Sequence, residues 1–104
     1  MKKLRFSEIA ERDLDQIWNY IATESGNVDT AKRIVESLVS RLSILAREPQ
    51  AGTARDGIDT GLRGLPIGRY IVYYRDEGAL VLISRIIHGS REQAAAYYED
   101  LPGT

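Results

Sequence analysis

The hydrophobic residues of this chain change their spacing once, and that change limits the folds open to it. Between residues 7 and 48 apolar side chains recur every three or four positions, which predicts two amphipathic helices. Between residues 62 and 88 branched and aromatic residues predominate and the period falls to two, which predicts strands. Helices that precede most of the strands indicate an α+β fold, in which an antiparallel sheet carries an N-terminal helical hairpin on one face.

Both helices have recognisable ends. The first is expected over Ser7–Ser25, because a serine hydroxyl at its start can accept from an unpaired backbone N–H and Gly26 can end the helix. The second is expected over Asp29–Glu48, with a cap from Asn27 or Asp29 and a stop at the proline that follows. The link between the helices is short, so they should form an antiparallel hairpin.

The strand-like segments are short and bounded by turn residues. Three of them follow one another after residue 61, and an acidic, glycine-containing turn between the last two predicts antiparallel pairing. A first strand before the helices and a short C-terminal helix over Arg91–Tyr98 complete the order βααβββ plus helix. The expected strands are Lys3–Phe6, Leu62–Ile67, Arg69–Arg75 and Ala79–His88. The expected core includes Trp18, Ile21, Leu38, Leu42, Tyr73 or Tyr74, and Ile83.

The last strand is apolar on both sides. Strict alternation divides its side chains between two faces, with Leu80, Leu82 and Ile86 on one and Val81, Ile83 and Ile87 on the other. Neither face suits water, so either the terminal helix or a partner should cover the face away from the hairpin. Residues 49–61 are polar and rich in glycine, and we interpret them as a connector, although a segment of that length is often functional.

Composition excludes several classes of protein. The 104 residues suit one domain, 1–104, and a formal charge of −1 argues against nucleic-acid binding through bulk positive charge, so sequence-specific binding is not expected. No cysteine and a single histidine make a protein-built metal site improbable, and no cofactor is expected. No apolar run is long enough for a signal segment or a membrane span. We therefore expect a cytoplasmic protein without a membrane partner.

Arginines dominate the basic residues in the second half of the chain. Eleven of the 14 basic residues are arginine, and residues 61–75 carry three arginines with no acid. Guanidinium groups are favoured where carboxylates or phosphates are gripped, so a docking surface for an acidic partner is expected here. For any single arginine a solvated charge at a strand edge is the simpler explanation. The candidates for binding a partner or a target are Arg63, Arg69, Arg75, Arg85 and Arg91.

His88 is the one histidine and ends the last expected strand. An imidazole between Arg85 and Arg91 could act as a general acid or base on a phosphodiester. The alternative is a structural histidine that bonds to backbone where the strand turns into the helix. No second histidine and no nearby lysine support catalysis, so the structural explanation is favoured.

Four blocks of sequence, in this order, resemble the ParE branch of the RelE/ParE superfamily of plasmid-stabilisation toxins. They are residues 7–21 (SEIAERDLDQIWNYI), 48–52 (EPQAG), 61–75 (GLRGLPIGRYIVYYR) and 86–91 (IIHGSR). The resemblance implies a toxin of a type II toxin–antitoxin system, which a cognate antitoxin neutralises by wrapping it in a hetero-oligomer. ParE-type members are known to inhibit DNA gyrase and block replication.

The RelE branch instead cleaves mRNA on the ribosome, and this is the alternative function. Only Arg69 and His88 match positions that a nuclease of that branch would use, so catalytic residues are expected only in that case. The resemblance to ParE favours inhibition by binding over catalysis. If the arginines prove structural, the inhibitory surface is expected on the hairpin around Glu11, Asp15 and Asn19.

Overall fold

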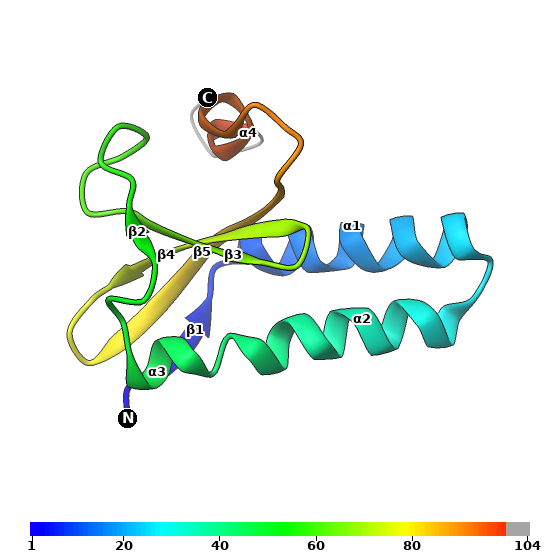
Figure 1. Ribbon diagram of the computed structural model, residues 1–104, viewed down its shortest axis with the longest axis horizontal. Coiled ribbons are helices and arrows are strands. Elements are labelled where there is room, and N and C mark those ends of the chain that lie inside the picture. Colours follow the sequence, from blue (N-terminus) through cyan, green and yellow to red (C-terminus); the bar gives the residue numbers. More distant parts are fainter. Residues whose placement is uncertain (100–104) are drawn as a thin grey trace.

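The computed structural model describes residues 1–99 and has the expected α+β architecture. A five-stranded sheet, in the order β1-β5-β4-β3-β2, carries a long hairpin of α1 and α2 on one face and the short helix α4 on the other (Figure 1). The helices are α1 (Glu8–Ser25), α2 (Val28–Arg41), α3 (Ile44–Arg47) and α4 (Gln93–Tyr98). The strands are β1 (Lys3–Phe6), β2 (Thr53–Ala54), β3 (Arg63–Ile67), β4 (Tyr70–Asp76) and β5 (Leu80–His88).

The ends of the hairpin helices follow the capping residues. The Ser7 hydroxyl accepts from the N–H of Ala10 at 3.0 Å, and Gly26 ends α1 with a φ of 65° in the left-handed region. Asn27, one of the two expected caps, accepts from the backbone N–H groups of Asp29 and Thr30. The hairpin of antiparallel helices is confirmed.

The periodicity predicted one continuous second helix that ends at Glu48, and this prediction is wrong. The helix breaks after Arg41, where the N–H groups of Leu42 and Ser43 bond to carbonyls three residues earlier and tighten the turn. A three-residue turn brings side chains three positions apart into line. Leu42 and Leu45 are both completely buried, so the tighter turn lets them enter one core.

The sheet is mixed rather than wholly antiparallel. β3, β4 and β5 pair antiparallel as expected, but β1 runs parallel to β5 because the chain returns to the β1 edge through a long crossover. The segment expected to be a connector contains β2, whose Thr53 and Ala54 pair with Gly64 and Arg63. The interpretation of residues 49–61 as a plain connector was therefore incomplete.

A bulge in β5 changes which side chains reach the hairpin. Tyr73 is opposite Arg85 and Tyr74 is opposite Ile83, so Ser84 has no partner residue and the alternation shifts by one. The predicted faces are wrong for Ile86, which joins Val81 and Ile83 in the core under the hairpin, and for Ile87, which lies on the opposite face.

Two apolar clusters lie on opposite faces of the sheet. The hairpin cluster contains the expected Leu38, Leu42, Tyr74 and Ile83, all buried. Trp18 and Ile21 are only partly buried, contrary to expectation, because the hairpin extends past the sheet (Figure 1). The second cluster joins the sheet to α4, so the terminal helix covers the other face. Its buried members are Leu62, Tyr73, Ile87, Ala96 and Tyr97.

A buried ion pair ties α1, β5 and α4 together. Asp13 and Arg85 are 6% and 5% exposed, and their side chains meet through two hydrogen bonds of 2.9 and 3.0 Å. The Asp13 carboxylate also accepts from the N–H of Ile86, beyond the point where β1 stops pairing with β5. One Arg85 nitrogen donates to the carbonyls of Ala96, Tyr97 and Glu99 at the end of α4. Every charged atom of the pair is thus hydrogen-bonded within the fold.

Removing one partner of this pair should be far more damaging than removing an exposed one. Arg85→Ala leaves Asp13 buried without its counter-charge, and we expect a loss of about 3–5 kcal/mol in the free energy of unfolding. Arg91→Ala removes the exposed pair with Glu99 and should cost less than about 1 kcal/mol. Urea unfolding followed by circular dichroism measures both, and equal losses would contradict the assignment.

Candidate functional site

A groove of about 630 Å³ lies between the α1–α2 hairpin, the β3–β4 turn and the end of β5. Its apolar part comes from both helices and from β3, and polar side chains stand around it. The apolar lining is Ile21, Ile34, Leu38 and Ile67, and the remaining lining residues are Tyr20, Arg33, Ser37, Arg41, Gly68, Arg69, Tyr70 and His88.

Three arginines from two parts of the chain border this groove. Arg33 and Arg41 come from α2, and Arg69 comes from the β3–β4 turn, where Gly68 adopts a φ of 59°. All three are exposed, none forms an ion pair within residues 1–99, and no acidic residue lines the groove. An added Cβ at Gly68 would lie 3.9 Å from Arg41 Nη1, so the Arg41 guanidinium sits beside the turn that presents Arg69. We call Arg33, Arg41 and Arg69 the groove arginines.

Aromatic rings form another part of the wall. Tyr70 and His88 are opposite each other in the β4–β5 pairing, and their rings meet edge to face with centroids 5.4 Å apart. Tyr20 of α1 is 60% exposed. Burial raises the pKa of the Tyr70 phenol, the nearby Tyr20 raises it further, and Arg69 opposes both effects. The Tyr70 phenol therefore stays neutral at physiological pH and can donate a hydrogen bond to a ligand.

The His88 imidazole is tied to the turn after β5. Its Nδ1 accepts from the N–H of Ser90 at 3.1 Å and lies 2.8 Å from the Ser90 hydroxyl. Because Nδ1 accepts a backbone N–H, the neutral ring carries its hydrogen on Nε2. His88 and Arg69, the two candidates for nuclease chemistry, line the same groove.

Two of the five expected docking arginines hold the segments on either side of β2, Arg63 the one before it and Arg75 the one after it. Arg63 donates to the carbonyl of Gly52 at 2.6 Å and to the side chain of Gln50 at 2.5 Å. Arg75 pairs with Asp59 and also donates to a backbone carbonyl of the same segment. Both guanidinium groups are therefore engaged inside residues 49–61, together with Tyr74, whose hydroxyl bonds to Pro49 and Gly52.

The other expected arginines differ from one another in exposure. Arg85 is buried in the ion pair with Asp13, so its guanidinium is not on the surface. Arg91 is exposed but pairs with Glu99, and it borders a second hollow of about 350 Å³ beside Tyr20, Tyr70 and His88. Of the five, only Arg69 is both exposed and without an ion pair within residues 1–99.

Sequence reasoning missed Arg33 and Arg41 as site residues. The available signal was their spacing with Ser37, since residues four and eight positions apart form a row along one side of a helix. What the sequence did not reveal is that the β3–β4 turn lies beside that row. Among residues 1–99 no group of three or more His, Asp or Glu side chains could hold a metal ion. No helix in the same range is long and apolar enough to cross a membrane.

Comparison with known proteins agrees with this fold and its extent. Residues 4–93 match the family described as ParE toxin of type II toxin–antitoxin system, parDE. Toxin ParE1 of Caulobacter vibrioides is 33% identical over 95 residues, which cover 91% of this chain and 97% of that protein.

Two solved structures have the same fold. The chromosomal ParDE toxin–antitoxin system of P. aeruginosa aligns with a TM-score of 0.74 at 24% identity, over 85% of this chain and 96% of that one. The toxin–antitoxin complex RelBE2 of Mycobacterium tuberculosis aligns with a TM-score of 0.58 at 28% identity, over 84% and 96%. The fold is that of the RelE/ParE superfamily of toxins. Within that superfamily, the chain belongs to the ParE family of toxins of type II toxin–antitoxin systems.

Hydrogen exchange can test whether Arg63 anchors residues 50–61 while the groove arginine Arg69 does not. Arg63→Ala removes two charge-assisted hydrogen bonds to the segment before β3, and amides of residues 50–61 should exchange about tenfold faster. Arg69→Ala should leave those amides unchanged. Faster exchange in both variants, or in neither, would show that Arg63 does not anchor this segment.

Proposed function

We propose that this ParE-family toxin acts by binding and inhibiting DNA gyrase in the cytoplasm, and that a cognate antitoxin neutralises it in a hetero-oligomer. Membership of the ParE family and the resemblance described above support gyrase as the target. The similar chain of M. tuberculosis belongs to a toxin–antitoxin complex, which supports an antitoxin as the partner.

The observation that carries the binding function is the groove with its three arginines, which form no ion pair in the part of the chain that the structure describes. An amphipathic segment of the antitoxin would place apolar side chains against Ile21 and Ile34 and carboxylates on the groove arginines. Within residues 1–99 no acid lines the groove, so carboxylates of a partner would meet no like charge among its lining residues. Of the five arginines that the sequence predicted to bind a partner, Arg69 is the one that lines this groove.

Inhibition by binding also fits the chemistry of the groove better than catalysis does. The Nδ1 of His88 is occupied by Ser90, and the raised pKa of Tyr70 keeps its hydroxyl protonated, so the hydroxyl is not available as a general base. A general acid and base of matched pKa would be needed to cleave a phosphodiester.

Ribosome-dependent cleavage of mRNA is the second candidate. It is favoured by one observation, which is that Arg69 and His88 line the same groove. An arginine beside a histidine could stabilise charge and transfer a proton during cleavage. This function requires the Nε2 of His88 to reach the substrate.

Two assays run side by side separate the candidates. We expect the purified toxin to inhibit supercoiling by gyrase and to increase cleaved DNA, while leaving mRNA intact on translating ribosomes. Addition of the protein from the neighbouring small reading frame should restore gyrase activity. Ribosome-dependent cleavage with unaffected gyrase would establish the alternative function.

Toxicity should depend on Arg69 more than on His88. Arg69→Ala is a surface change, so it should alter the free energy of unfolding by no more than about 0.5 kcal/mol and leave the melting temperature near that of wild type. It should nevertheless relieve growth inhibition, because a contact to the target is lost. His88→Ala should be milder, because inhibition by binding needs no proton transfer. Growth on induction and thermal unfolding measure both variants. Full detoxification by His88→Ala in a folded protein would contradict inhibition by binding.

A further inference from the structure

The groove combines guanidinium groups that have no ion pair among residues 1–99 with aromatic rings that a ligand can reach. Arg33, Arg41 and Arg69 supply three positive charges from two parts of the chain. Tyr20 exposes more than half of its surface beside them, and Tyr70 and His88 line the same groove as a contacting pair. Cations that follow a groove and rings that accept planar groups are the two parts of a site for single-stranded nucleic acid.

The spacing of the cations suits an extended anion better than a single charge. Arg33 and Arg41 are eight residues apart on α2, which places them about 12 Å apart along the helix axis. Arg41 lies beside the turn that carries Arg69. One carboxylate or phosphate cannot satisfy all three, whereas a backbone with repeated charges can.

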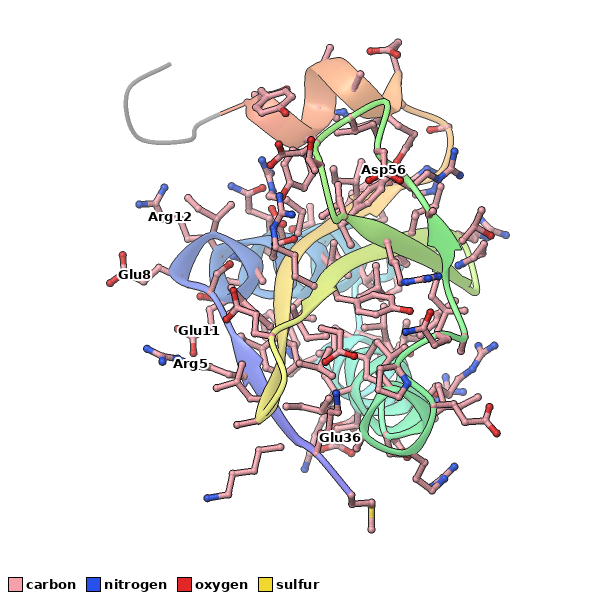
Figure 2. The ribbon with its side chains drawn as sticks, turned by 90° about the vertical axis from the view of Figure 1, so that its left-hand side faces the viewer. Arg5, Glu8, Glu11, Arg12, Glu36 and Asp56 are labelled. Carbon is pink, nitrogen blue, oxygen red and sulfur yellow. The ribbon has the colours of Figure 1, made fainter. Side chains whose placement is uncertain are left out.

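The protein has a formal net charge of −1, but the charged residues that line the groove are positive. Glu8 and Glu11, labelled in Figure 2, project from the first turns of α1. Glu11 precedes Tyr20 by nine residues, or about 13 Å along the helix. Glu24 lies one turn after Tyr20, yet within residues 1–99 no acid lines the groove, and its charged lining residues are arginines.

We propose that this groove binds single-stranded DNA, with the groove arginines on phosphates and Tyr20, Tyr70 and His88 against bases. The inference does not rest on gyrase being the target, because it concerns the toxin alone. An acidic peptide would use the arginines and the apolar floor but would leave the exposed Tyr20 ring without a role. DNA uses the arginines and the rings together.

This binding would give the antitoxin a direct way to act. An acidic segment in the groove would occupy the same arginines that hold phosphates, so the two ligands would exclude each other. When the antitoxin binds in the groove, a toxin bound to gyrase and cleaved DNA would lose its contacts with the DNA.

Fluorescence anisotropy with the full toxin and a fluorescein-labelled dT12 oligonucleotide tests the proposal. We expect binding at 50 mM KCl that weakens with salt, with a slope of log K against log salt of about −2 for three neutralised phosphates. Arg41→Ala and Arg69→Ala should each weaken binding about tenfold and make that slope shallower. Tyr20→Ala should weaken binding roughly tenfold through lost stacking, with the slope unchanged.

The controls decide between an oligonucleotide with its bases and a polyanion that lacks them. Arg12→Ala removes an exposed arginine of α1 outside the groove, labelled in Figure 2, and should leave the affinity for dT12 unchanged. A twelve-residue oligoglutamate and an abasic oligonucleotide of equal length should both bind more weakly than dT12. Absence of binding at 50 mM KCl, an equal loss with Arg12→Ala, or oligoglutamate binding as tightly as dT12 would each overturn the proposal. The gyrase assay is separate, so its failure would not be confused with these results.

Discussion

The Asp13–Arg85 ion pair is the contact on which the arrangement of the other elements depends. β1 pairs with β5 only as far as Ile83, and beyond that point the edge of β5 would face α1 with an unpaired N–H. Asp13 supplies the missing acceptor to Ile86 and at the same time holds Arg85, which caps the end of α4. A buried carboxylate and guanidinium are costly to desolvate, and here both are fully hydrogen-bonded. One pair therefore fixes how the hairpin, the sheet and the terminal helix are placed.

The arginines of this chain divide according to what they contact. Arg63 and Arg75 bind backbone and side chains of residues 49–61, and Arg85 binds α4. Arg33, Arg41 and Arg69 have no acidic partner in the part of the chain that the structure describes. Because a guanidinium can serve either as an internal clamp or as a contact for an anion, the count of arginines says little about a docking surface. Whether an arginine belongs to a docking surface depends on what its side chain already contacts within the fold.

The sequence predicted most of the fold because its signals were local. Ser7, Gly26 and Asn27 act within one turn of a helix, and the alternation over β3 to β5 reflects one sheet. It failed where distant residues decide the outcome. The bulge at Ser84 is stabilised by its bonds with Tyr73, Tyr97 and Ser7, and the parallel pairing of β1 joins residues 3–6 to residues 80–83. The groove was missed for the same reason, since α2 and the β3–β4 turn meet only in the folded protein.

The pairing of β1 with β5 has a consequence for how the toxin is made. Lys3 is opposite Leu80, so the first strand cannot take its place in the sheet until the last strand has left the ribosome. His88 and the carbonyls that Arg85 holds come later still. Contacts so far apart in sequence make folding slow and leave apolar surface exposed meanwhile. A nascent chain therefore has neither its sheet nor its complete groove until residues 80–88 have emerged, and during that interval its apolar residues stay open to contact by another protein.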